Sequence, residues 1–220
     1  ELDPGFLVPL MYQTYILQTR GEHARVAALL ETLAARREEL TPFGRCWLDG
    51  LKAFTKQRYY EGMQHMRAAA RIAPRDPITI HWIGYLALLA NRPHETVDAF
   101  KVLGANPWGS HPLGVTWQWI LCRAHHMLGE HELAVQAYEL ALQSDADNED
   151  AAMPLLTEYV NTEQWAKAEP LAELLVKKSG KREKAEQHRL QTTFGKVLVA
   201  LGKHEQAIER RAIAVAVSAR

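Results

Sequence analysis

The stretch from Cys122 to His126 holds a close group of potential metal ligands. Cys122 and His126 are four residues apart, so on a helix they share one face, and a thiolate and an imidazole are both ligands of Zn²⁺. His125 points away from that face. Two ligands do not form a site, and no third ligand is evident unless His111 folds back toward them. We therefore predict no metal site, and we keep a metal-binding or enzymatic domain that uses the Cys122/His126 region as the alternative.

No segment carries the local signature of an active site. The sequence has neither a phosphate-binding glycine loop nor a Gly-x-Ser-x-Gly nucleophile elbow. We predict that the chain is not an enzyme and that it needs no cofactor.

Three further histidines, His23, His131 and His204, stand at one recurring place, just after a turn glycine. Recurrence at a fixed place indicates a structural role. We predict that these rings pack against their neighbours and are not ligands.

The composition excludes several classes of partner. The 220 residues include 26 basic and 26 acidic side chains, so no overall charge draws the chain to nucleic acid or to an anionic membrane. The most apolar run, residues 78–90, is shorter than the ~20 residues that cross a bilayer. Two cysteines without paired spacing predict no disulfide framework. We expect neither a nucleic-acid partner nor a membrane partner.

The elements that position these side chains are predicted to be helices, because apolar residues recur three and four positions apart along most of the chain. Three segments also resemble one another, each a turn followed by a helix: RGEHARVAALLETL from Arg20, LGEHELAVQAYELAL from Leu128 and LGKHEQAIERRAIAV from Leu201. Weaker copies lie between them: KQRYYEGMQHMRAAA, ANRPHETVDAFKVL and TEQWAKAEPLAELL. The chain is therefore a repeat protein of the all-α class.

The six copies can be aligned on one position where the second helix passes close to the first. The aligned residues lie 34 to 39 positions apart: Val26, Gly62, Thr96, Ala134, Ala168 and Ala207. Twelve residues before each of them, in the preceding helix, stand Thr14, Gly50, Gly84, Cys122, Leu156 and Gly195. Most of these side chains are small, as a close contact between two helices requires.

This pattern resembles the tetratricopeptide repeat family, whose unit of 34 residues forms two antiparallel helices. One unit carries the resemblance in Gly50, Gly62, Ala69 and Pro74, and another in Gly129, Ala134, Tyr138 and Ala141. Three residues depart from the pattern. Leu156 replaces a small residue, Arg211 replaces a bulky apolar one, and Pro170 lies inside a predicted helix, where it removes a hydrogen bond.

The resemblance implies a single right-handed α-solenoid domain, residues 1–220, of about six antiparallel helix pairs. The approximate units are 7–40, 43–76, 77–110, 115–148, 149–187 and 188–220. The opening ELDPGF and the apolar residues of AIERRAIAVAVSAR predict a fragment of a longer chain, or an array that forms a homodimer through its C-terminal helix.

In this family the first helices of successive units line a concave groove that receives an extended peptide or a partner helix. The positions that match that groove here are Tyr15, Trp47, Leu51, Phe54, His81, Tyr85, Trp119, Arg123 and His126. Aromatic and arginine side chains supply much of the binding energy at interfaces. For any single ring, a place in the core is the alternative.

The resemblance implies a protein-interaction module or scaffold. Some family members hold the terminal carboxylate of chaperones with Lys and Asn residues, and that set is absent from the matching positions. We therefore expect an apolar peptide, or another domain of the parent chain, as the partner. The repeats also resemble those attached to bacterial signalling proteins, which implies a signalling role in the cytoplasm.

Overall fold

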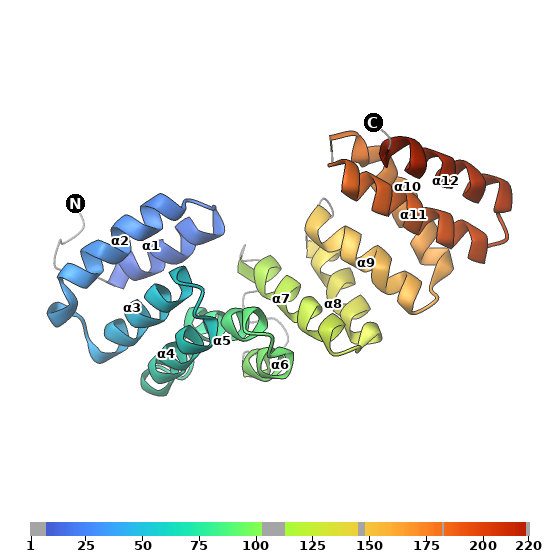
Figure 1. Ribbon diagram of the computed structural model, residues 1–220. Coiled ribbons are helices and arrows are strands. Elements are labelled where there is room, and N and C mark those ends of the chain that lie inside the picture. The colour runs from blue at the N-terminus through green and yellow to red at the C-terminus, as the bar shows by residue number, and fades with distance from the viewer. Residues whose placement is uncertain (1–7, 103–112, 145–147, 182, 219–220) are drawn as a thin grey trace. The chain divides into compact units, whose positions relative to one another are not determined.

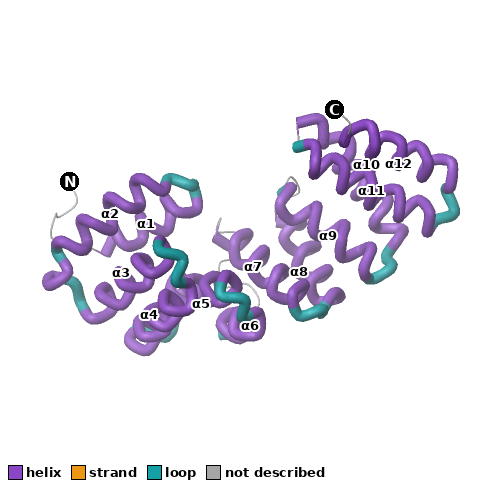
Figure 2. The backbone as a smooth tube through the Cα atoms, in the orientation of Figure 1, coloured by secondary structure: helices purple, strands orange, loops and turns teal. Residues whose placement is uncertain are grey.

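The computed structural model describes residues 8–102, 113–144, 148–181 and 183–218. Within these ranges the chain is helical, with short 3₁₀ turns and no strand (Figure 2). The all-α prediction is confirmed. None of the helices in these ranges is long and apolar enough to cross a membrane.

The chain divides into two compact units, residues 1–109 and 110–220. The helices of the first unit are α1 (Val8–Thr19), α2 (His23–Ala35), α3 (Pro42–Thr55), α4 (Tyr59–Ile72), α5 (Pro77–Leu89) and α6 (Pro93–Lys101) (Figure 1). Those of the second are α7 (Leu113–Met127), α8 (His131–Ser144), α9 (Glu149–Asn161), α10 (Trp165–Lys178), α11 (Lys184–Ala200) and α12 (His204–Ser218). Short 3₁₀ turns cover Arg37–Glu39 and Ser179–Lys181. In each unit, consecutive helices pack as hairpin pairs, and the joining of both units into one superhelix stays a prediction.

Side-chain caps start several of the first helices. Thr41 Oγ1 accepts the backbone N–H of Gly44 at the start of α3, and Asp76 accepts that of Thr79 at the start of α5. A proline follows each cap, in the first turn of a helix, where its missing N–H costs nothing. Asn148 caps α9 in the same way through Ala151 N.

The turn inside every helix pair has the same backbone form. Gly21, Gly129 and Gly202 have φ of 70°, 72° and 75°, the left-handed region that glycine adopts without strain. In the three weaker copies the corresponding residues are Gln57, Asn91 and Glu163, with φ of 58°, 58° and 56°. Each of the six lies five residues before an aligned position, so the structure confirms the alignment of the copies.

Close helix contacts form at the small residues that the alignment singled out. A Cβ added to Gly62 would lie 3.0 Å from the carbonyl oxygen of Gly50, and one added to Gly84 would lie 2.6 Å from the Phe100 ring. Thr96 Oγ1 donates a hydrogen bond of 3.1 Å to the Gly84 carbonyl. These contacts bring α3 against α4 and α5 against α6.

The departures from the family pattern leave the helices intact. Pro170 lies inside α10, which continues to Lys178, and Pro154 lies inside α9. Leu156 is fully buried in the core of the second unit, whereas Arg211 is exposed.

Candidate functional site

Four of the six predicted groove residues in the first unit are buried in its core. Tyr15, Trp47, Leu51 and His81 are all at least 97% buried. The Trp47 indole donates a hydrogen bond to Thr79, and the Tyr15 hydroxyl lies 3.1 Å from His81 Nε2. These side chains pack in the core, which is the alternative that the sequence left open for individual rings.

Phe54 and Tyr85 are partly exposed and lie side by side, with ring centroids 6.1 Å apart. The Phe54 ring also meets the buried Trp82 ring edge-on at 5.1 Å. These two residues form a partly open aromatic surface on α3 and α5.

The remaining three predicted residues lie on α7. Trp119 is partly buried, and the Arg123 guanidinium lies 5.4 Å from its ring centroid. Arg123 and His126 are exposed. Both line a cavity in the second unit.

That cavity has a volume of about 310 Å³ and is lined by Arg123, His126, Met127, Tyr138, Met153, Pro154, Thr157, Glu158 and Arg189. All of these except Tyr138 come from α7, α9 and α11, which are the first helices of three consecutive pairs. Two arginines, two methionines and a tyrosine give the cavity cationic and apolar walls. Such walls suit a ligand that combines an apolar group with a negative charge.

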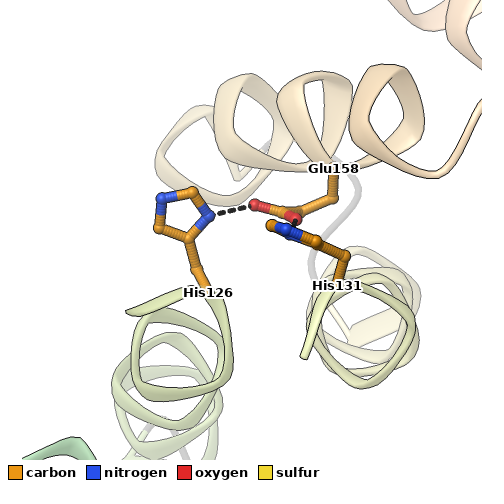
Figure 3. A group of neighbouring side chains, drawn as sticks. All are labelled: His126, His131 and Glu158. Carbon is orange, nitrogen blue, oxygen red and sulfur yellow. Dashed lines mark hydrogen bonds and ion pairs between the residues drawn. The ribbon is translucent and has the colours of Figure 1, made fainter. Parts of the chain in front are cut away.

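A buried carboxylate forms one wall of the cavity. The Glu158 side chain is 1% exposed and contacts two imidazoles (Figure 3). Its Oε1 lies 2.5 Å from His126 Nδ1, and its Oε2 lies 2.8 Å from His131 Nδ1. Each carboxylate oxygen thus has one imidazole nitrogen as its hydrogen-bond partner.

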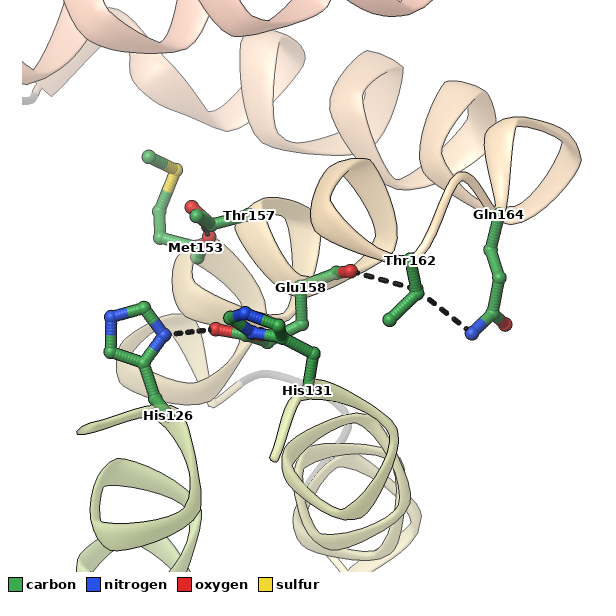
Figure 4. Close-up of polar contacts among 7 residues, drawn as sticks. All are labelled: His126, His131, Met153, Thr157, Glu158, Thr162 and Gln164. Atoms are coloured by element: carbon green, nitrogen blue, oxygen red, sulfur yellow. Dashed lines mark hydrogen bonds and ion pairs between the residues drawn. The ribbon is translucent and has the colours of Figure 1, made fainter. Parts of the chain in front are cut away.

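The backbone of α9 holds Glu158 near the end of its helix. Thr162, which follows the last residue of α9, donates its hydroxyl to the Glu158 carbonyl at 2.8 Å and accepts a hydrogen bond of 3.0 Å from Gln164 Nε2 (Figure 4). Beside Glu158 on the same helix, the Thr157 hydroxyl lies 3.4 Å from the Met153 carbonyl. Glu158 thus projects from α9 toward the turn between α7 and α8.

Cys122 and His126 do not come together to form the metal-binding or enzymatic site of the alternative prediction. Cys122 is fully buried in the core of the second unit, and burial raises the pKa of its thiol above its usual range. His126 is exposed and turns to Glu158, while His125 pairs with Glu130 at 2.6 Å. His111 lies outside the described residues.

Two residues of this group, His131 and Glu158, are not among the site residues predicted from the sequence. The predicted packing role of His131 rests on its shared place with His23 and His204, but those two histidines are exposed, so that prediction is wrong for both. Glu158 belongs to the next helix pair, 32 residues after His126. No local spacing signals such a contact, whereas the alignment of units, which puts α7 beside α9, could have suggested it.

Comparison with known proteins places the fold. No protein-family model matches the chain, and no curated protein matches it. Among solved structures, MamA shares 17% identity at a TM-score of 0.68, over 80% of this chain and 91% of that one. A variant form of the nearly identical TPR-like repeats of a Podosopora anserina putative kinesin light chain shares 16% at 0.64, over 82% and 97%. A tetratricopeptide repeat protein from Parabacteroides merdae shares 13% at 0.59, over 93% and 77%. At these identities the likeness concerns the fold alone, and it confirms the tetratricopeptide-like class.

Proposed function

We propose that this chain, which has the tetratricopeptide-repeat fold, is a non-catalytic protein-interaction module that binds an extended peptide or a partner helix in its second unit. One observation carries the proposal. The cavity lies along α7, α9 and α11, and Arg123 and His126, two members of the expected groove, line it. Because three consecutive pairs contribute, a ligand that follows the cavity would contact each of them.

The walls indicate the chemistry of the ligand. Met127, Met153 and Tyr138 offer apolar surface, and methionine adapts its shape to different side chains. Arg123 and Arg189 are exposed and offer forked donors for a carboxylate. A volume of about 310 Å³ holds one or two side chains of a ligand, so the rest of a peptide would lie over the rim. We therefore expect a peptide with an apolar anchor beside an acidic residue.

The first unit carries an aromatic surface of its own. Its partly exposed rings, Phe54 and Tyr85, are the groove residues there that a ligand could reach, and the buried Tyr15, Trp47, Leu51 and His81 would support them from inside. We also propose a cytoplasmic signalling scaffold, with the ligand supplied by a regulatory protein or by another domain of the same polypeptide.

Self-association is a second candidate. Ile208 and Val215 on α12 are 70% and 62% exposed, and they lie seven residues apart, on one face of the helix. We propose that two copies pair through this face.

The binding proposal is tested by selecting ligands from a display library of short random peptides and measuring the affinity of the selected peptides. Replacing Arg123 and Arg189 by alanine should weaken binding roughly tenfold or more, because truncating an interface arginine often costs more than about 1 kcal/mol. The matched control removes the same charge outside the cavity, at Lys177 and Arg211, which are exposed on α10 and α12.

Circular dichroism establishes that both double variants keep the helix content of the wild type. Selected peptides that bind the Arg123→Ala/Arg189→Ala variant as tightly as the wild type would place the binding surface elsewhere. An equal loss of peptide affinity in the Lys177/Arg211 control would show that the effect comes from the net charge of the chain and not from the cavity.

A further inference from the structure

Three side chains with metal-binding atoms converge in the second unit, next to the turn between α7 and α8. His126 comes from the last turn of α7, His131 from the first residue of α8 and Glu158 from α9. Gly129, with φ of 72°, reverses the chain between the two histidines, whose ring centroids are 6.1 Å apart. One ligand atom from each residue lies within 4.8 Å of the other two (Figure 3).

The burial of Glu158 distinguishes this group from a surface cluster. A carboxylate that is 1% exposed has lost nearly all of its water, and burial of a charge is costly unless cations or hydrogen bonds replace that water. Its carboxylate oxygens contact the two imidazoles, which carry charge only when protonated. A divalent cation would balance the buried charge directly.

We propose that His126, His131 and Glu158 bind a divalent late transition-metal ion, and that this ion is Zn²⁺. Two imidazoles and one carboxylate are a donor set that suits Zn²⁺, which binds imidazole nitrogen and carboxylate oxygen at about 2.0–2.2 Å. Hard cations such as Mg²⁺ and Ca²⁺ prefer oxygen ligands throughout.

A small rearrangement admits the ion. Ligand atoms of a tetrahedral zinc ion are roughly 3.3 Å apart, given bond lengths of about 2.0–2.1 Å, whereas the two imidazole–carboxylate distances are 2.5 and 2.8 Å. The ion therefore has to separate each of these pairs by roughly 1 Å or less. The three ligand atoms lie within 4.8 Å of one another, so a pair at that limit has to approach by about 1.5 Å. The His126 side chain is 47% exposed, so it is able to turn. Each neutral imidazole then carries its proton on Nε2 and offers the Nδ1 lone pair to the metal.

The fourth position of the ion would open toward the cavity, because His126 and Glu158 both line it. Water or an anionic group of a ligand would occupy that position, near Arg123 and Arg189. The metal site does not depend on the peptide proposal, since its three ligands belong to the chain itself.

The test uses the purified chain without an affinity tag, stripped with a chelator. Zn²⁺ is titrated by calorimetry, and Co²⁺ is added separately because tetrahedral Co²⁺ absorbs strongly in the visible range. We expect one equivalent of Zn²⁺ per chain. Loss of a partner that only supports a ligand lowers metal affinity about 10–100-fold, so His126→Ala, His131→Ala and Glu158→Gln should each lower it at least that much.

His204→Ala is the matched control, because His204 follows Gly202 as His131 follows Gly129 and starts α12 as His131 starts α8. It should leave the Zn²⁺ affinity unchanged. His126→Ala alters an exposed side chain and should keep the wild-type circular dichroism, which separates a lost site from a lost fold. The proposal is overturned if the wild type takes up no stoichiometric Zn²⁺, or if the control loses as much affinity as the ligand variants.

Discussion

The indole nitrogen of Trp47 donates a hydrogen bond of 2.7 Å to the hydroxyl oxygen of Thr79, with both side chains fully buried. The bond joins α3 to α5, and thus the second helix pair to the third. Thr79 also donates its hydroxyl to Asp76, the residue that caps α5. A side chain that the sequence assigned to ligand binding therefore connects two repeats and steadies the start of a helix.

Replacing Trp47 by alanine should destabilise the fold. Removal of a buried tryptophan costs about 3–5 kcal/mol, because it leaves a cavity, and here it also removes the hydrogen bond to the Thr79 hydroxyl. Urea unfolding, followed by circular dichroism, measures the change in the free energy of unfolding. Tyr60→Ala, at an aromatic residue that is 49% exposed, is the control and should cost far less. Equal effects of the two substitutions would contradict the packing role of Trp47.

Alanine should have opposite effects at two of the aligned glycines. At Gly84 the new methyl group would lie 2.6 Å from the Phe100 ring, and overpacking of this kind costs about 1–3 kcal/mol. At Gly195 the nearest atom would be 3.7 Å away, so Gly195→Ala should gain up to about 1 kcal/mol of helix propensity.

Thermal and urea unfolding of the two variants check the sign of each change. Phe100→Leu should recover part of the loss in the Gly84→Ala background, because it removes the ring that the methyl group meets. Destabilisation of both glycine variants to the same extent would show that the two contacts are equally tight.

Acid should weaken the first unit through His81. Burial lowers the pKa of His81 to about 3, from an ordinary value of 6.5. In the unfolded chain the His81 ring therefore binds a proton below about pH 6.5, whereas in the folded chain it binds one only below about pH 3. The free energy of unfolding must fall with decreasing pH across this window, by at most about 1.4 kcal/mol per pH unit from this residue.

Urea unfolding between pH 7 and pH 4 measures that slope. The variant Tyr15→Phe/His81→Phe removes the titrating ring together with its hydrogen-bond partner, and its slope should be shallower than that of the wild type. In proton NMR of the folded wild type, the His81 ring signals should not move down to pH 4. A shift of these signals near pH 6.5 would contradict the burial argument.

The fold could be predicted from the sequence because its rules are local and repeated. Gly21, Gly129 and Gly202 marked three turns, and the spacing of the copies located the other three, where Gln57, Asn91 and Glu163 adopt the same backbone form. A single copy of such a pattern is weak evidence for a helix pair, but six copies at a regular spacing strongly indicate a helical repeat.

The candidate site could be predicted only in part. Helical periodicity distinguishes the faces of one helix, but it does not tell a ring that faces a groove from one that packs against the next pair. The sequence therefore put Trp47, which is buried, in the same predicted groove as Arg123, which is exposed. The contact between His131 and Glu158 joins different helix pairs, and its geometry depends on how those pairs pack. Side-chain chemistry gave no signal either, because a glutamate on a helix is usually solvated.

The α12 surface predicts a concentration-dependent molecular mass. Ile208 and Val215 expose 70% and 62% of their surface, and a second copy placed against them would remove that apolar area from water. A stable dimer buries about 800 Å² on each partner, which is more than two side chains provide, so further residues of the second unit must contribute. Sedimentation equilibrium at several concentrations should show a monomer–dimer mixture for the wild type, and Ile208→Lys/Val215→Lys should shift it to monomer. Leu133→Lys, at a residue 45% exposed on α8, introduces a similar charge away from this face and should leave the mixture unchanged. A wild type that stays monomeric at every concentration would rule out the homodimer.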